Sequence, residues 1–249
     1  MSIAEKLQTV AENQQKVYDA GHSDGVQSEY DRFWDAYQAP TGTGNLLAQN
    51  YCMFAYAGFG WTDTTFKPKY NMRPVSDLCT GMFRESAITD LKSILDNCGV
   101  TLNFRQASAF NNVFTDSTIT HVGSISTLGA TSLGSLFNAA KHLQTIEELV
   151  LKTDGSQSFS SAFTNAIALT DITVTGCIGK AASFQYCPLS PTSMKSIIAA
   201  LKNFTGTGSE HSVAIKFNEQ CWTALEADSP APDGGTWKDY VSNTLSWNV

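Results

Sequence analysis

Aromatic and aliphatic residues recur along the middle of the chain with a regular internal spacing. In VFTDSTITHVGSI (residues 113–125), Phe114 is followed five residues later by Ile119, and then by Val122 and Ile125 at steps of three. A Phe, an aliphatic residue and a second aliphatic residue three positions later occur four times: Phe83-Ile88-Leu91, Phe114-Ile119-Val122, Phe137-Leu143-Ile146 and Phe163-Leu169-Ile172. A shortened fifth copy has Phe184 followed by Leu189.

The repeat predicts stacked units rather than separate amphipathic helices. The Phe residues are 31, 23, 26 and 21 positions apart, yet each of the four full copies continues with a third apolar residue: Ile94, Ile125, Leu149 and Val174. A unit this short cannot bury its apolar face alone, so successive units must stack into one core. Chance matches in a chain with 14 Phe residues are the alternative. The recurrence of the later apolar positions argues against chance.

We therefore predict an α/β fold, a leucine-rich repeat solenoid with short parallel strands and with irregular turns or short helices opposite them. The strands are expected in ITHVGSI (119–125), TIEELVLK (145–152) and LTDITVTG (169–176). The turns are expected in SLFNAAKH (135–142) and SAFTNAIA (161–168), and the extra residues of the first unit, DNCGVTLNFRQ (96–106), are expected to form a loop.

The pattern outside the repeats predicts four regions: 1–38, 39–75, 76–190 and 191–249. Residues 1–38 are expected to be helical, with a heptad-like seam over 2–20 that either packs on its own domain or mediates self-association. Residues 39–75 hold an aromatic set that we interpret as an N-terminal cap, with a sugar-stacking surface as the alternative. That set consists of Tyr51, Phe54, Tyr56, Phe59, Trp61, Phe66 and Tyr70.

Residues 76–190 hold the repeats, and the segment after them is expected to form an α/β C-terminal cap. Its pattern predicts a helix over 193–203, an alternating strand within 211–218 and a helix over 219–228. A surface loop over 229–236 and a terminal edge strand over 244–249 complete the prediction.

Charge and hydropathy exclude some classes of partner. Charged residues make up 16% of the chain and its net charge is −7, with no cluster of Lys and Arg, so we expect no nucleic-acid partner. The N-terminus carries Glu5, Lys6 and Glu12 without an apolar core, which is unlike a signal peptide. No run of about 18 apolar residues occurs, so we expect synthesis in the cytoplasm and no membrane insertion.

The chain shows no recognisable catalytic or metal-binding motif. Its six cysteines are scattered, without a Cys-x-x-Cys pair, and are expected to be reduced and buried. The stretch GATSLGS (129–135) has glycines spaced as in a phosphate-binding loop, but Ser135 stands where that loop needs Lys. His121 and His142 lie in neighbouring repeats and are expected to be solvated. We therefore expect no enzyme activity, no cofactor and no metal.

With these residues in view, the sequence resembles the BspA-like leucine-rich repeat proteins of bacteria. Turns of that family read as an aromatic residue, an Asn or Cys a few residues later, and then Leu-Thr-x-Ile. AFTNAIALTDITV (162–174), with Asn165 in the Asn or Cys position, and SLFNAAKHLQTIEEL (135–149) are the closest copies. The copies at Phe83 and Phe114 have Glu85 and Asp116 near that position.

The segments around the repeats resemble the opening, cap and closing segments of prophage-encoded or tail-associated proteins from gut Firmicutes. They are KVYDAG (16–21) with EYDRFWDAYQ (29–38), YAGFGWTDTTFKPKYNMRP (56–74) and PLSPTSMKSIIAALKNFTGTG (188–208). The resemblance implies a virion-associated or tail-associated protein that contacts the host surface.

We therefore expect a non-enzymatic binding or structural module whose partner is a protein or glycan on a host cell surface. An exported bacterial cell-surface adhesin is the alternative, and a cell-wall-active hydrolase is a third. From the phase of the repeat, the strand-bearing side is the expected binding face. The candidate binding residues there are Thr120, His121, Gln144, Glu147, Thr170 and Asp171.

Overall fold

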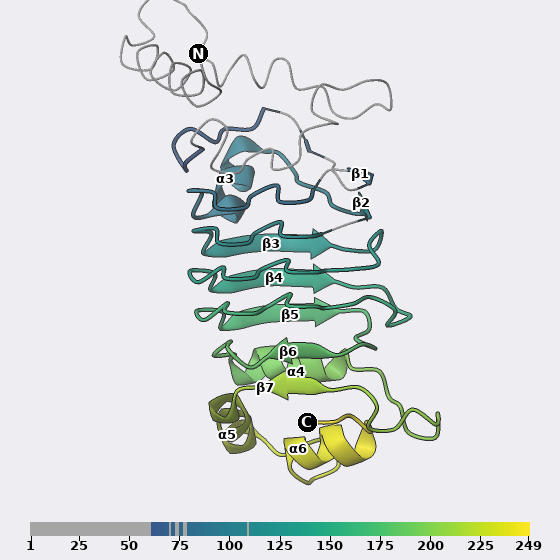
Figure 1. Cartoon of the computed structure of the whole chain (residues 1–249). Coiled ribbons are helices and arrows are strands. Elements are labelled where there is room, and N and C mark those ends of the chain that lie inside the picture. The colour runs from purple at the N-terminus through teal and green to yellow at the C-terminus, as the bar shows by residue number, and fades with distance from the viewer. Residues whose placement is uncertain (1–60, 70, 73–74, 77–78, 109) are drawn as a thin grey trace, which may run out of the picture.

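The computed structural model describes residues 61–249, except for residues 70, 73–74, 77–78 and 109 (Figure 1). The helical segment and self-association seam predicted in residues 1–38 lie outside the described residues. The same is true of most of the aromatic set predicted in 39–75.

The described residues form a mixed α/β fold with small parallel sheets and few helices. The paired strands are β1 (Val75–Ser76) with β2 (Gln106–Ala107), β3 (His121–Ser126) with β4 (Thr145–Val150) and β5 (Asp171–Thr175), and β6 (Ala182–Phe184) with β7 (Ile215–Phe217). The helices are α3 (Leu91–Cys98), α4 (Pro191–Ala199), α5 (Glu219–Asp228), α6 (Trp237–Asp239) and a π-helical turn at Tyr240–Thr244. Among these helices none combines the length and apolar character needed to cross a bilayer.

The three strands predicted from the repeat are confirmed. β3, β4 and β5 form one parallel sheet and lie one above another in Figure 1. Val122, Ile146 and Ile172 occupy matching positions in the register, and all three side chains are buried. The predicted turns at 135–142 and 161–168 are turns rather than helices.

The Phe residues of the repeat form a continuous column of stacked rings. Phe83 and Phe114 have ring centroids 5.4 Å apart with planes 3° from parallel, and Phe114 and Phe137 are 5.1 Å apart at 8°. The stack continues through Phe163 and Phe184, and then through Phe217, which the sequence pattern missed. We call these six residues the Phe column, and the chain segment from one Phe to the next a pass.

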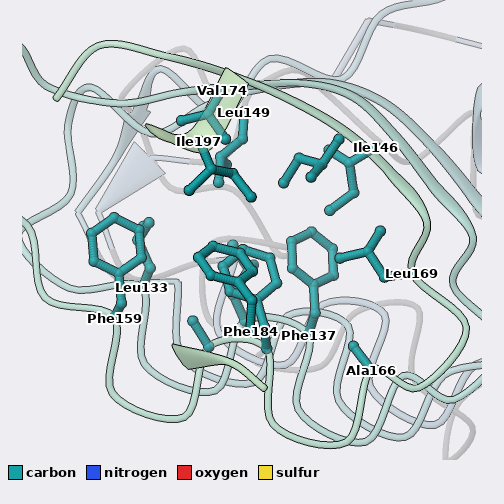
Figure 2. Packing of buried hydrophobic residues seen from close by; sticks show 14 of the residues in the cluster. Leu133, Phe137, Ile146, Leu149, Phe159, Ala166, Leu169, Val174, Phe184 and Ile197 are labelled. Atoms are coloured by element: carbon teal, nitrogen blue, oxygen red, sulfur yellow. The ribbon is translucent and has the colours of Figure 1, made fainter. Parts of the chain in front are cut away.

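The core is filled from two sides, by side chains of the strand side of the stack and by side chains of the turns opposite. In Figure 2, Leu149, Val174 and Ile197 point inward from one side and Phe137 and Phe184 from the other. All five side chains are buried, because each pass is covered by its neighbours.

Aromatic rings also close the two ends of the Phe column. At one end Phe66 meets Phe83 edge-on, with a centroid distance of 6.0 Å, and Trp61 meets Phe66 edge-on in turn. At the other end Trp222 of α5 lies edge-on to Phe217 at 5.1 Å. Edge-to-face contacts end a stack, because they present ring edges to the last ring face.

The turns that hold the first four Phe residues of the column share an unusual backbone. The residues two positions before and two after the Phe adopt left-handed conformations, with φ between 52° and 62°. These residues are Gly81, Asn112, Ser135 and Ser161 before the Phe, and Glu85, Asp116, Ala139 and Asn165 after it. Asn165, placed in the Asn or Cys position of the resemblance, is exposed on this turn. The position therefore serves the turn and supplies no buried asparagine.

A small buried side chain follows three positions after each of the first five Phe residues of the column and lets neighbouring turns approach. These residues are Ser86, Ser117, Ala140, Ala166 and Cys187. Backbone hydrogen bonds then join the turns: the Phe83 N–H donates to Val113 O at 2.8 Å and the Phe114 N–H to Leu136 O at 2.9 Å.

Helices stand where a strand would continue the three-stranded sheet at either edge. The loop predicted over 96–106 is shorter than expected and covers 99–105, because α3 extends to Cys98 and β2 begins at Gln106. Asp90 caps α3 by accepting a hydrogen bond from the Ser93 N–H, and Gly99 ends it in the left-handed conformation.

At the other edge, two serines of α4 satisfy the backbone of β5. The Ile172 N–H donates to Ser193 Oγ and the Val174 N–H to Ser196 Oγ, both at 2.8 Å. Helix α4 thus covers a strand edge that would otherwise present unpaired N–H groups.

The C-terminal predictions need two corrections. The helix predicted over 193–203 begins at Pro191 and ends at Ala199, because Ser190 caps it and Pro suits its first position. The terminal strand predicted over 244–249 is wrong: Thr244 ends the π-helical turn, and an isolated bridge joins Asn248 to Ala214. The helix over 219–228 and a strand within 211–218 are confirmed.

Replacing Gly176 with alanine should destabilise the fold. Gly176 follows β5 with a φ of 96°, and a Cβ there would lie 2.3 Å from the Leu151 carbonyl oxygen of the preceding pass. The strain and the overlap together predict a loss of about 2–4 kcal/mol in the free energy of unfolding, measured with urea. Gly206→Ala is the control, because nothing lies within 4 Å of a Cβ at that position. Equal losses in the two variants would contradict the close approach.

Candidate functional site

The six candidate binding residues all lie at or near the starts of the three central strands. Thr120, Gln144 and Thr170 directly precede β3, β4 and β5. His121 and Asp171 are the first residues of β3 and β5, and Glu147 lies within β4. The Gln144 N–H donates to Thr120 O at 2.8 Å, and the Thr170 N–H donates to Gln144 O at 3.1 Å. The candidate residues chosen from the spacing of the repeat therefore lie on neighbouring passes in the fold. We call the outward surface of β3, β4 and β5 the strand face.

Two of these six side chains hold the passes together. Thr120 Oγ1 donates to Thr89 O at 3.0 Å, and Thr170 Oγ1 donates to Gln144 O at 3.3 Å. Their hydroxyls are engaged by the backbone of the preceding pass. Gln144 and Glu147 are the more exposed of the six, together with Asp171.

His121 lies between two carboxylates from neighbouring passes. Its Nδ1 is 3.4 Å from Asp90 Oδ1, and its Nε2 is 3.5 Å from Glu147 Oε1. Lys92 Nζ contacts Asp96 within α3 and lies 3.9 Å from Glu147 Oε1. His121 and Glu147 of the strand face thus form a charged cluster with Asp90, Lys92 and Asp96 of α3 and its N-cap, and carboxylates outnumber the cations in it.

The surroundings of Asp90 and Lys92 favour the charged forms of these two side chains. Partial burial works against ionisation of Asp90, but the hydrogen bonds from Ser93 and the nearby His121 outweigh it and lower the pKa of Asp90. The hydrogen bond to Asp96 raises the pKa of Lys92. Both groups are therefore charged near neutral pH.

Asp90→Asn should remove a small, pH-dependent part of the stability. Because the pKa of Asp90 is lower in the folded state, its contribution is present above the unfolded-state pKa and is lost as the pH falls through the folded-state pKa. Asn still caps the helix, and the site is partly solvated, so the loss near pH 7 should be about 1 kcal/mol or less. Urea unfolding of both proteins near pH 7 and again at about pH 2.5 checks this. A difference that is unchanged in acid would contradict it.

A second polar group occupies the middle of the strand face. Glu148 accepts hydrogen bonds from Ser124 Oγ on β3 at 3.3 Å and from Thr175 Oγ1 on β5 at 3.1 Å. Asp171 accepts from Thr170 and from Ser190. Sequence reasoning missed Glu148, although it follows Glu147, because strict alternation would point it inward. The strand pairing shifts register between Ile146 and Leu149, which brings both glutamates outward.

Two adjoining pockets lie beside β3, and nothing in the sequence pattern indicated them. One of about 180 Å³ lies between α3 and β3, and one of about 330 Å³ lies beside residues 102–105. They share Leu102, Phe104 and Ser124, so they form one depression, which we call the edge groove.

The cysteines of the described residues are free thiols, and three of them are buried: Cys79, Cys187 and Cys221. Burial raises the pKa of Cys187 to about 12 and also raises the pKa values of Cys177 and Cys221. These thiols therefore stay protonated near neutral pH. Across residues 61–249, with the gaps given above, no three His, Cys, Asp or Glu side chains gather as a metal site.

No protein-family model, curated protein or solved structure matches this chain. The arrangement of its own residues is therefore what points to a function, and the strand face with the edge groove is the candidate site.

Proposed function

We propose that this protein is a recognition module without catalytic activity, built as a leucine-rich repeat solenoid of the BspA-like kind. The stacked passes, the parallel strands β3, β4 and β5 and the Phe column support the solenoid. Helix α3 on one side and the α4–α5 region on the other serve as its ends.

The strand face is the proposed binding surface. The observation that carries this proposal is that all six residues chosen from repeat phase lie together on one side of a rigid core. Buried positions alternate with outward ones along β5, so the outward side chains are held in place from beneath. Regular rows of polar side chains on a rigid support suit recognition of a large partner.

The proposed partner is a protein or glycan on a host cell surface, and the proposed setting is a phage virion or tail. Both rest on the resemblance of the repeats and their flanking segments, and the net charge of −7 disfavours nucleic acid as the partner. Tail and lysis genes next to the coding sequence would support this setting. Genes for export and surface anchoring there would favour the adhesin instead.

Binding of the full-length protein to a glycan array and to host cells tests the proposal. Gln144→Ala and Glu147→Gln change exposed side chains of the strand face, and each should weaken binding at least about tenfold. Asp116→Asn is the matched control, because it removes an exposed carboxylate from a turn at the Phe column and Asn suits the left-handed conformation there.

Three results would overturn the proposal. Unchanged binding by both strand-face variants would exclude the strand face, and an equal loss in Asp116→Asn would show a non-specific charge effect. Turnover of a cell-wall glycan or an ester that disappears in His121→Gln would indicate an enzyme.

A further inference from the structure

The edge groove follows the unpaired side of an edge strand. β3 lies at the end of the β3–β4–β5 order, and on its outer side the preceding pass supplies α3 in place of a strand. Helix α3 ends at Cys98. Beyond it, none of the backbone hydrogen bonds found among the described residues joins β3 to residues 100–105. An extended segment can pair with such an edge through its main chain.

Aliphatic side chains contribute eight of the 17 residues that line the groove, and most of the others are polar. Leu91, Leu95 and Val100 line its smaller part, and Leu128 and Val150 line its larger part. The one aromatic residue of the lining, Phe104, is only 2% exposed, so the groove offers no ring face for stacking. This surface suits aliphatic side chains better than sugar rings.

Arg105 gives the larger part of the groove a positive charge that the described residues leave unpaired. Its side chain is exposed, and no ion pair with it occurs within the described part of the chain. The other cation of the groove, Lys92, is already engaged by Asp96 and Glu147. Asn103 Oδ1 accepts the Arg105 N–H at 2.9 Å, which shapes the turn and leaves the amide Nδ2 for a ligand.

We propose that the edge groove binds an extended peptide that brings an aliphatic side chain together with a carboxylate. The aliphatic side chain packs on Leu102, Leu128 and Val150, and the carboxylate pairs with the Arg105 guanidinium, whose fork matches two carboxylate oxygens. This inference rests on the proposed recognition function and specifies its partner as a protein.

Nuclear magnetic resonance titration of the labelled full-length protein with small probes tests the inference. N-acetyl-leucine should shift the amides of Arg105, Ser124, Ser126 and Leu128 saturably, with a dissociation constant in the millimolar range expected for so small a ligand. N-acetyl-leucinamide, which lacks the carboxylate, should bind at least about tenfold more weakly. N-acetyl-Leu-Glu-amide, whose carboxylate is on a side chain, shows whether a peptide C-terminus or an acidic residue is preferred.

Variants separate the carboxylate contact from general charge. Arg105→Gln should abolish the saturable shifts, Arg105→Lys should retain part of them, and Lys141→Gln, which removes an exposed cation from the turn after Phe137, should leave them unchanged. No saturable shift with either carboxylate probe would overturn the inference. Tighter binding of N-acetylneuraminic acid than of N-acetyl-leucine would overturn it in favour of an acidic glycan.

Host-cell binding distinguishes failure of this inference from failure of the proposed function. If Arg105→Gln binds host cells normally while Glu147→Gln does not, the strand face is the binding surface and the peptide groove is wrong. If both variants lose binding, the groove is part of the recognition surface, as we infer. If neither loses binding, both proposals fail.

Discussion

Replacing Phe137 with alanine should lower the free energy of unfolding by about 3–5 kcal/mol, measured by urea denaturation. Phe137 has no exposed surface and is stacked between Phe114 at 5.1 Å and Phe163 at 5.7 Å. Alanine would leave a cavity in the middle of the Phe column, and it would also remove two ring contacts worth about 0.5–1.5 kcal/mol each. The surrounding passes are held by backbone hydrogen bonds on both sides and cannot close the gap easily.

Two controls show whether the loss comes from the column. Phe137→Leu should cost clearly less, because leucine fills most of the space without stacking. Ile167→Ala removes an apolar side chain that is 55% exposed, and it should change stability by no more than about 0.5 kcal/mol. A loss below about 1 kcal/mol in Phe137→Ala would show that the stacked rings contribute little.

The second large effect is expected at Gln157, which is fully buried. Its Oε1 accepts the Lys152 N–H at 2.8 Å, and its Nε2 donates to the carbonyl oxygens of Thr127 at 2.8 Å and Ala130 at 3.2 Å. The side chain therefore links the turns that follow β3 and β4. Gln157→Met should cost about 2–4 kcal/mol, because it keeps the shape but leaves the Lys152 N–H and the Ala130 carbonyl without partners.

Gln157→Glu should be destabilising in a pH-dependent way. A carboxylate there would face the Thr127 and Ala130 carbonyl oxygens in a buried site, so its folded-state pKa should be raised. The loss in the free energy of unfolding is then fully present above the folded-state pKa of the new carboxyl group, and it decreases as the pH falls through that pKa. Urea denaturation of both proteins near pH 7 and at about pH 4.5 measures the change.

Ser156→Ala is the control for both Gln157 variants, because Ser156 is the exposed neighbour of Gln157. It should change stability by no more than about 0.5 kcal/mol at either pH. A Gln157→Glu variant as stable as the unmodified protein near pH 7 would contradict the role of the amide.

The central strands could be predicted because their signal is local and repeated. Val122 and Ile125 read as inward positions from one copy alone, and the later copies repeat the same order. The helices at the two edges of the three-stranded sheet could not be predicted in this way. Leu91 and Ile94 have the same spacing as Val122 and Ile125, yet they lie in α3, because steps of three suit one face of a helix as well as this strand.

The part of the candidate site that lies on the repeated strands could be predicted, and the part that lies outside them could not. Repeat phase places His121 and Glu147 on neighbouring passes, and their side chains lie 3.5 Å apart. Asp90 joins them from a helix cap, and Arg105 reaches the edge groove from a segment outside the repeated pattern. Neither position follows from spacing, because both depend on how the α3 pass departs from the other passes.

By itself, the sequence determined that residues 83–189 form stacked units with a Phe column inside and polar rows on the strand side, because each unit must bury the same apolar positions against the next. Only the tertiary structure decided where the stack ends, since a helix and a strand can both bury apolar residues at steps of three. It also decided which groups meet at those ends: the serines of α4 on the edge of β5, the amide of Gln157 between two turns, and Arg105 beside the open edge of β3. These contacts join segments whose spacing along the chain does not repeat, so no local pattern encodes them.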